Sequence, residues 1–320
     1  MLTYIIRRVL ILIPMAFVIC FLVYLGLELT PGDAVSHMIN PDAAGSMNPA
    51  QLEALRQSLG LGQPFHVRFW AWFTNLLQGN FGYSMSGGVP ISNIIATRLP
   101  ATLELAAVAL VFSTVVGSLL GVVSALKRGS KTDSALTVVG MLGVSIPEFF
   151  FGLVAISIFA LNLGWFPVGG RSMPGYVTLW DRLPHMVMPA MVLSIMLTAG
   201  VMRYARSSML DALSRDFIKT ARSKGLPEWR VNLLHGFRVA LTPVVVLIGF
   251  RLPVLIGGSV IIEQVFQWPG IGNEFISAVR SQDYPVVMTI ALLSVMAVLI
   301  ASLIVDILTA VIDPRVRLGE

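Results

Sequence analysis

Residues that could carry out catalysis are sparse in this sequence and do not assemble into a known constellation. A phosphate-binding loop of the form G-x-x-x-x-G-K-[ST] is absent, and its nearest look-alike, RGSKTD at residues 128–133, lacks the required glycines. The histidines are scattered, no cysteine pairs with them, and no H-E-x-x-H motif occurs. The segment GYSM at Gly82 is not the Gly-x-Ser-x-Gly elbow of a serine hydrolase. The sequence therefore predicts no enzyme and no metal, ATP or other cofactor held by this chain itself.

Three charged residues fall inside long apolar runs and are candidates for lining a transport pathway. Arg251 lies near the middle of one run, Glu148 follows Pro147 in another, and Asp306 lies near the end of a third. A charge at the centre of a bilayer costs at least about 2.5–3.5 kcal/mol on insertion scales, so such a group should face protein or water. Arg251 either forms a structural pair with Glu148 or Asp306, or lines a pathway and meets a carboxylate of the transported molecule. The sequence leaves both interpretations open.

The elements that position these charges are apolar and long. Of the 320 residues, 56% are hydrophobic and only 12% are charged, whereas a soluble domain has about a quarter charged residues. A spanning helix needs about 20 mostly apolar residues, and six runs qualify. They cover residues 9–27, 102–126, 135–163, 186–202, 239–262 and 284–312. The composition therefore predicts an all-α integral membrane protein with six transmembrane helices, the first of which is expected to be retained.

Lysine and arginine are distributed unevenly among the connections between these runs. Most of them lie before the first run, between the second and third, between the fourth and fifth, and after the sixth. Because cytoplasmic connections have the excess of basic residues, both termini are predicted to be cytoplasmic. The net charge of +5 follows this topology, so nucleic acid is not indicated as a partner.

A long external loop of residues 31–100 is predicted after the first run. Two helices are expected in it, over residues 48–60 and 64–82, the second rich in aromatic side chains. Trp70, Trp72 and Phe73 are typical of an aromatic belt at the membrane interface. The belt is the favoured interpretation, and a docking surface for an external partner is the alternative.

One charged stretch, residues 214–243, interrupts the apolar chain between the fourth and fifth runs. Ser214 is a suitable helix cap, Asp216 suits the first turn, and Gly225 suits a left-handed stop. A short helix is therefore predicted over residues 215–224, followed by a second helix that leads into the fifth run.

This short helix is predicted to be amphipathic. Its basic side chains lie on one side, and Phe217, Ile218 and Ala221 lie on the other. A helix of about ten residues is only marginally stable alone, so something must pack on it. Three interpretations compete, namely a basic helix on anionic lipid, a simple positively charged loop, and a helix that docks into a groove of a cytoplasmic partner.

The order of residues in this stretch resembles a known family. DFIKTARSKGLPEWRVNLLHGFRVALTP, residues 216–243, is similar to the E-A-A-x-x-x-G loop of ATP-binding-cassette (ABC) importer permeases, above all those of the peptide and nickel branch. Further motifs follow the order of that family over nearly the whole chain. They are TPGDA, LGLGQPF, LLQGNFGYS, LPATLEL, VSALKRGSKTD, RSSMLDALSRDF, VFQWPGIGNEF, SQDYPVV and VIDPRVRL.

The resemblance implies a permease subunit of the bacterial inner membrane with the type I importer fold. Its expected parts are an N-terminal segment with the first span (residues 1–30), a helical periplasmic loop (31–100), and a five-helix core (101–320). The core includes a cytoplasmic coupling loop over residues 207–238. An ion-coupled secondary transporter of small solutes is the alternative, although it would more readily show inverted repeats and paired intramembrane acids.

The resemblance also implies partners. Such a permease pairs with a second, homologous permease to form the pathway for di- or oligopeptides, and a periplasmic solute-binding protein delivers the substrate. Two cytoplasmic ATP-binding-cassette subunits bind ATP and Mg and drive transport. The residues expected to couple to these ATPases are Asp216, Phe217, Ile218, Lys219, Thr220, Ala221 and Gly225.

Three positions depart from the pattern of the family. Asn80 replaces the Asp of its G-D-x-G motif. Lys219 stands where the broad motif has Glu, although a basic residue is usual in the peptide branch. Arg251 stands where relatives commonly have an uncharged residue.

Overall fold

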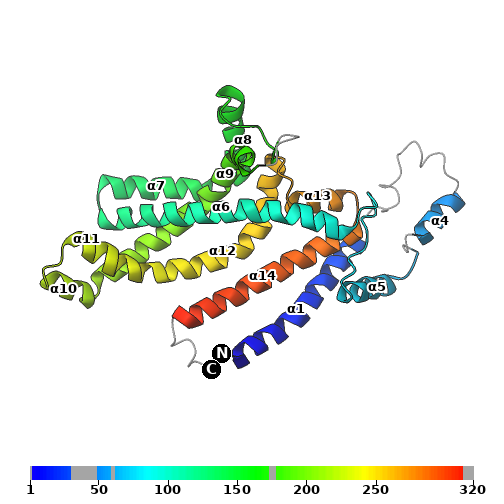
Figure 1. Cartoon of the computed structure of the whole chain (residues 1–320), viewed down its shortest axis with the longest axis horizontal. Helices are drawn as coiled ribbons and strands as arrows, with labels where there is room; N and C mark the ends of the chain where they lie inside the picture. Colours follow the sequence, from blue (N-terminus) through cyan, green and yellow to red (C-terminus); the bar gives the residue numbers. More distant parts are fainter. Residues whose placement is uncertain (1, 30–48, 59–61, 173–177, 313–320) are drawn as a thin grey trace. The chain divides into compact units, whose positions relative to one another are not determined.

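The computed structural model describes residues 2–29, 49–58, 62–172 and 178–312 (Figure 1). Over these ranges the chain is helical apart from its turns and an isolated antiparallel bridge between Tyr83 and Pro90. It divides into two compact units. The first combines Met1–Thr102 with Pro269–Leu299, and the second combines Leu103–Trp268 with Ile300–Glu320.

The first unit contains helices from both ends of the sequence. An aromatic cluster joins two of them: the buried ring of Phe69 lies edge-on to Phe21 and Tyr24, with ring centroids 5.4 and 5.5 Å apart. An ion pair between Arg68 and Glu28 closes the same contact. The helices are α1 (Leu2–Glu28), α4 (Pro49–Ser58), α5 (Phe65–Leu77), the start of α6 (Ile91–Leu126), α13 (Ile271–Arg280) and most of α14 (Tyr284–Ile312).

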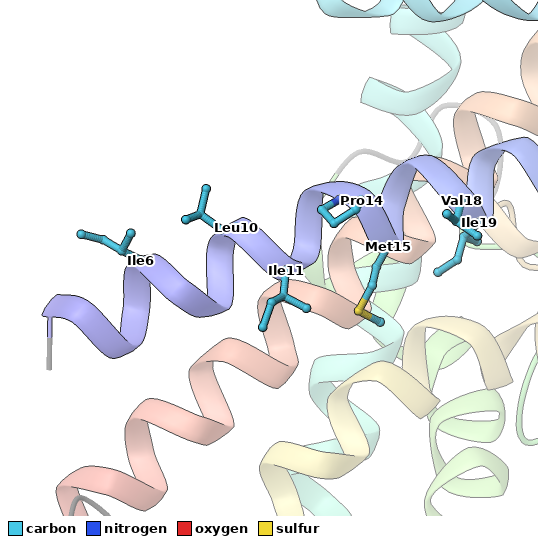
Figure 2. Close-up of a pocket in the computed structure, with 7 residues that line it drawn as sticks. All are labelled: Ile6, Leu10, Ile11, Pro14, Met15, Val18 and Ile19. Atoms are coloured by element: carbon cyan, nitrogen blue, oxygen red, sulfur yellow. The ribbon is translucent and has the colours of Figure 1, made fainter. Parts of the chain in front are cut away.

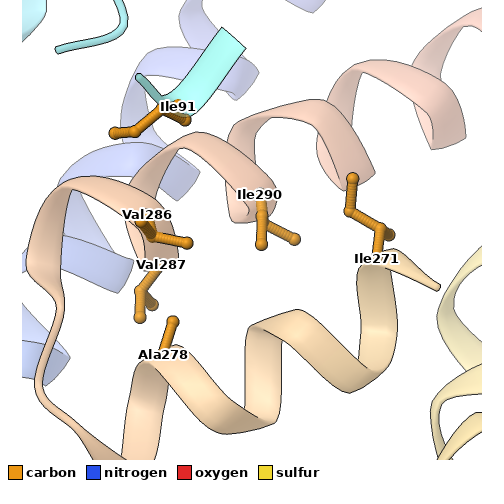
Figure 3. Packing of buried hydrophobic residues seen from close by; sticks show 6 residues of the cluster. All are labelled: Ile91, Ile271, Ala278, Val286, Val287 and Ile290. Atoms are coloured by element: carbon orange, nitrogen blue, oxygen red, sulfur yellow. The ribbon is translucent and has the colours of Figure 1, made fainter. Parts of the chain in front are cut away.

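A second apolar cluster in this unit holds α13 against α14 (Figure 3). Next to it, the buried carboxylate of Asp283, between the two helices, fixes the turn that precedes α6. Its Oδ2 accepts hydrogen bonds from the hydroxyl of Ser84 and from both the hydroxyl and the backbone N–H of Ser86. The cluster consists of Ile91, Ile271, Ala278, Val286, Val287 and Ile290.

The second unit contains the remaining helices, with α9 at its centre. Figure 1 shows α10 and α11 at the same end of this unit as the turn between α6 and α7. The elements are the rest of α6, α7 (Lys131–Ser145), α8 (Glu148–Ala155), the π-helical turn η1 (Ile156–Asn162), α9 (Leu179–Ser214), α10 (Asp216–Ser223), α11 (Glu228–Arg230), the π-helical turn η2 (Val231–Phe237), α12 (Arg238–Val265) and the end of α14.

Glycines allow α6 and α9 to approach very closely. A Cβ atom added at Gly117 would lie 2.8 Å from Cβ of Val201, and one added at Gly121 would lie 2.6 Å from the carbonyl oxygen of Met202. Small residues permit such backbone contact between membrane helices, where packing replaces the hydrophobic effect. The side chains elsewhere on α6 that are most exposed are apolar and spaced four apart, as expected for a lipid-facing stripe. They are Val111, Val115 and Leu119.

Four of the described helical segments are long and apolar enough to cross a membrane. The third predicted run differs from a straight span, because α7 and the α8–η1 segment meet at 100°. The break falls at Ile146 and Pro147, since proline lacks the N–H that would continue the helix. The four segments are Ile91–Leu126, Trp180–Ser214, Glu228–Gly249 and Tyr284–Val305, and the bent pair adds a fifth if it is counted as one span.

The first helix has a shorter apolar segment, Leu10–Gly26. Along α1, apolar side chains line a shallow, open groove (Figure 2). Lipid chains are a suitable solvent for such a surface, whereas water is not. The lining residues are Ile6, Leu10, Ile11, Pro14, Met15, Val18 and Ile19.

We predict that Gly121→Leu destabilises the second unit. The added side chain has no space against the α9 backbone, and overpacking of this kind costs about 1–3 kcal/mol. The melting temperature of the detergent-solubilised protein measures the loss. Gly26→Leu on α1 is the control, because an added Cβ there meets nothing within 4 Å. Equal melting temperatures for the two variants would contradict the close α6–α9 contact.

Candidate functional site

The short helix α10 lies between α9 and α11 and begins one residue later than predicted. Arg215 occupies the N-cap position and makes no side-chain cap hydrogen bond. The prediction that Ser214 caps the helix is wrong, because its hydroxyl donates instead to the carbonyl oxygen of Asp211, in the last turn of α9. Asp216 is in the first turn, as expected, where its charge suits the positive end of the helix dipole.

The C-terminus of α10 is a glycine stop. Gly225 has a φ of +73°, a left-handed conformation that glycine adopts without steric cost. Its N–H donates to the carbonyl of Arg222 at 2.9 Å, and the N–H of Leu226 donates to the carbonyl of Ala221 at 3.4 Å. These two hydrogen bonds form a Schellman motif, which fixes where the helix ends and redirects the chain toward α11.

The apolar side of α10 is covered by the chain itself. Ile218 is fully buried and Ala221 is 7% exposed. They pack on Leu213, Leu226 and Val231, which we call the α10 seat. The apolar stripe predicted from the sequence therefore stabilises α10 within the subunit, and Ile218 and Ala221 are not available to an external partner. Val231 could not be foreseen as their contact, since it belongs to the π-helical turn η2.

The outward side of α10 is charged, and much of its charge is paired. Lys219 Nζ lies 2.8 Å from Oδ1 of Asp216, and these side chains are 72% and 92% exposed. At the flank, Arg222 donates two hydrogen bonds to Glu228, at 2.9 and 3.2 Å. Exposed pairs of this kind contribute little stability, so the pairing mainly reduces the net positive charge of the helix surface.

Phe217 is the large apolar side chain that α10 leaves partly open, with 38% of its surface exposed. Thr220, on the outward side, also remains exposed, although its hydroxyl donates to the carbonyl of Asp216. The outward surface of α10 thus consists of the aromatic ring of Phe217 beside polar side chains that include both positive and negative charges. An arrangement of this kind suits a protein groove better than an anionic lipid surface, which would favour an uninterrupted basic face.

A carboxylate clamp, not foreseen from the sequence, lies near the same end of the unit. Asp133, in the first turn of α7, accepts hydrogen bonds from Arg206 Nε at 2.8 Å and Nη2 at 2.9 Å. It also accepts from the hydroxyl of Ser124 and the N–H of Gly129. Because Arg206 belongs to α9, this Asp133 clamp ties the turn between α6 and α7 to the helix that continues into α10.

Of the three predicted pathway residues, the structure describes the side chains of Arg251 and Glu148 and does not pair them. Arg251, in α12, is partly buried, and its guanidinium approaches Gly200 of α9. Glu148, at the first position of α8, forms no ion pair with Arg251 in the described part of the chain. The side chain of Asp306 lies outside the described residues.

Two further acids that the structure describes are held by arginines. Glu104 accepts two hydrogen bonds from Arg171, and Glu274 pairs with Arg98. The described residues contain no group of three or more histidine, cysteine, aspartate or glutamate side chains that could hold a metal ion. The charged side chains described here therefore hold helices in position or lie on the surface.

This combination of apolar helices and a seated amphipathic helix defines a class of membrane transport subunits. The chain matches the family described as "Binding-protein-dependent transport system inner membrane component" over residues 117–318, and the N-terminal domain of such components over residues 1–106. The chain belongs to this family. It is therefore a multi-pass permease subunit of the inner membrane and not an enzyme.

Full-length relatives support the same assignment. The chain is 41% identical to the oligopeptide transport system permease protein AppB of Bacillus subtilis over 319 residues, which cover 99% of this chain and all of the relative. It is 36% identical to the glutathione transport system permease protein GsiC of Escherichia coli over 317 residues, 99% of each chain.

Solved structures show the fold. The inward-facing MetNI methionine ABC transporter matches 70% of this chain and 98% of its own, with a TM-score of 0.57 and 17% identity. An amino acid ABC transporter solved with histidines matches 68% and 92%, with a TM-score of 0.51 and 17% identity. The fold is that of a type I ABC importer permease.

We predict that Asp133→Asn weakens the connection between the α6–α7 turn and α9. Hydrogen bonds to charged groups contribute about 1.5–3 kcal/mol each, so a clear drop in melting temperature is expected. Lys127→Gln, which removes an exposed charge from the same turn, should have almost no effect.

A double variant distinguishes loss of the Asp133–Arg206 interaction from general damage to the turn. Asp133→Asn combined with Arg206→Gln should lose less stability than the sum of the two single variants, because the interaction is counted twice in that sum. Strict additivity of the two losses would show that the pair contributes nothing.

Proposed function

We propose that this chain is the permease subunit of an ATP-driven importer of di- or oligopeptides. It forms the pathway across the inner membrane with a second, homologous permease, and a periplasmic solute-binding protein delivers the substrate. Two cytoplasmic ATP-binding-cassette subunits bind ATP and Mg, for which this chain has no phosphate-binding loop. The names of the two full-length relatives support a peptide substrate, since glutathione is itself a peptide.

The proposed orientation places both termini in the cytoplasm, on the same side as α10. The support is electrostatic, because the connections next to α10 and at the α6–α7 turn are rich in lysine and arginine. Cytoplasmic loops of membrane proteins have this excess. The basic residues at the α6–α7 turn are Lys127, Arg128 and Lys131.

The observation that carries the proposal is the way α10 is held. An eight-residue helix is too short to be stable alone, yet α10 has a glycine stop and a buried apolar side on its own seat. A partner that pushes on its outward side therefore meets a supported element. Because α10 continues α9 and its seat includes Val231 of η2, displacement of α10 would reach both α9 and α12.

In this proposal the ATPase groove receives the outward side of α10. Phe217 enters the groove, and Asp216, Lys219 and Thr220 make polar contacts around it. Ile218, Ala221 and Gly225 act indirectly, since they hold the helix in place for docking. Buried aromatic residues surrounded by polar contacts commonly dominate the binding energy of protein interfaces.

We predict that Phe217→Asp removes the ATPase subunits from the transporter. The new charge would be buried without a partner in the groove, and loss of an aromatic anchor costs about 2 kcal/mol or more, about thirtyfold in affinity. The parent and the variant are extracted from native membranes in mild detergent, and the copurifying subunits are quantified. Tyr83→Asp is the matched control, since Tyr83 is an exposed aromatic residue of the first unit, outside α10.

Ala221→Asp gives an independent comparison. It should also remove the ATPases, but through loss of the α10 seat, so that the segment around α10 becomes sensitive to limited proteolysis. Phe217→Asp should keep the parent's resistance. ATPases retained at the parent level by Phe217→Asp would refute docking through this ring. A parent that copurifies with no ATPase would refute the importer proposal itself.

A further inference from the structure

Arg251 lies deep within the second unit. It is thirteen residues beyond the start of α12, which corresponds to about 20 Å along the helix axis. Gly200 lies at a similar depth, fourteen residues before the end of α9. A Cβ atom added at Gly200 would lie 2.8 Å from Nη2 of Arg251. The guanidinium therefore occupies the space that a side chain on α9 would otherwise fill.

The guanidinium of Arg251 has no partner in the described part of the chain: no hydrogen bond or ion pair involves it. This distinguishes it from other arginines of the subunit that have a carboxylate in contact. These pairs are Arg68 with Glu28, Arg98 with Glu274, Arg171 with Glu104, and Arg206 with Asp133. A guanidinium is always protonated, so Arg251 is a charge for which the described residues provide no counter-charge.

Lipid phosphate is a poor candidate for the missing partner. Arg251 lies near the middle of the apolar run of residues 239–262. The hydrocarbon core of a bilayer is about 30 Å thick, so a residue midway along such a run is about 15 Å from either headgroup layer. Long basic side chains can extend toward that layer. That of Arg251 instead lies against Gly200, on the neighbouring helix at the same depth. The partner must therefore reach the middle of the helices.

We propose that Arg251 binds the C-terminal carboxylate of the peptide as it passes through the pathway. This inference rests on the proposed function as a peptide importer. The planar guanidinium donates two parallel hydrogen bonds to a carboxylate, which a lysine ammonium cannot reproduce. Every unmodified peptide has this carboxylate whatever its sequence. A single arginine can thus serve many peptides, and the partner leaves again after each transport cycle.

The test compares peptides that differ only in this group. The complete transporter, with its native partner subunits and binding protein, is reconstituted into liposomes that contain ATP on the ATPase side. Uptake of alanine peptides of two to five residues is compared with uptake of the same peptides as C-terminal amides. Because the same binding protein delivers both forms, its own preference cancels when the acid-to-amide ratio of a variant is divided by that of the parent.

For Arg251→Gln we expect the acid-to-amide ratio to fall about tenfold, through slower uptake of the acids. Arg251→Lys keeps the charge but loses the paired geometry, so a fall of about threefold is expected. Arg203→Gln is the matched control, because it removes an exposed arginine from α9 close to Gly200. This control should keep the parent ratio.

Three outcomes would overturn the proposal. An unchanged ratio in Arg251→Gln, with uptake intact, would show that the carboxylate is not recognised there. Loss of the second permease from purified Arg251→Gln and Arg251→Lys would assign the missing partner to an acid of that subunit. No ATP-dependent uptake of any of these peptides by the parent would overturn the importer proposal together with this one, whereas the first two outcomes leave the importer intact.

Discussion

A guanidinium or carboxylate among apolar helices needs a partner, and the architecture of this permease follows from where those partners are found. Several of the charges described in the helices are paired within the chain, and some of these pairs join helices that are far apart in the sequence. Arg68 with Glu28 joins α5 to α1, and Arg206 with Asp133 joins α9 to α7. Burial of an ion pair adds little net stability compared with apolar packing, but removal of one partner is severe. Such pairs therefore specify which helices meet.

The need for a packing partner also explains why α10 packs on residues of its own subunit. A short charged helix would melt in water, and its apolar side would be exposed. The structure removes both problems with the α10 seat and a glycine stop. The outward side of α10 is therefore already folded before a partner binds. A preorganised surface loses less conformational entropy on binding than one that must fold first.

Local features of the sequence were good guides to local structure. Gly225 was expected to end a helix and has a positive φ. The aromatic segment after the first helix forms α5, which ends at Leu77 rather than at the predicted residue 82. These signals act within a few residues, through steric limits on the backbone and apolar periodicity. The expected fold of an importer permease was confirmed by the family match and by the solved structures.

Features that depend on distant residues could not be read from the sequence. Periodicity identified an apolar stripe on α10 but could not tell whether a partner or Val231 covers it. Asp133 and Arg206 are 73 residues apart, and no local pattern links them. The sequence placed Pro147 inside one apolar run but did not predict the bend, because proline determines where an N–H is missing but not the angle that the neighbouring helices impose.

The discontinuous first unit has a consequence for how the chain is made. Asp283 bonds to Ser84 across 199 residues, so this contact must wait while Leu103–Trp268, the long segment of the second unit, is synthesised. The second unit is nearly continuous, and its long segment can complete its packing earlier, since N-terminal parts generally fold first. The turn before α6 is therefore among the last elements to be fixed during biogenesis, after the helices on either side of α10 have assembled.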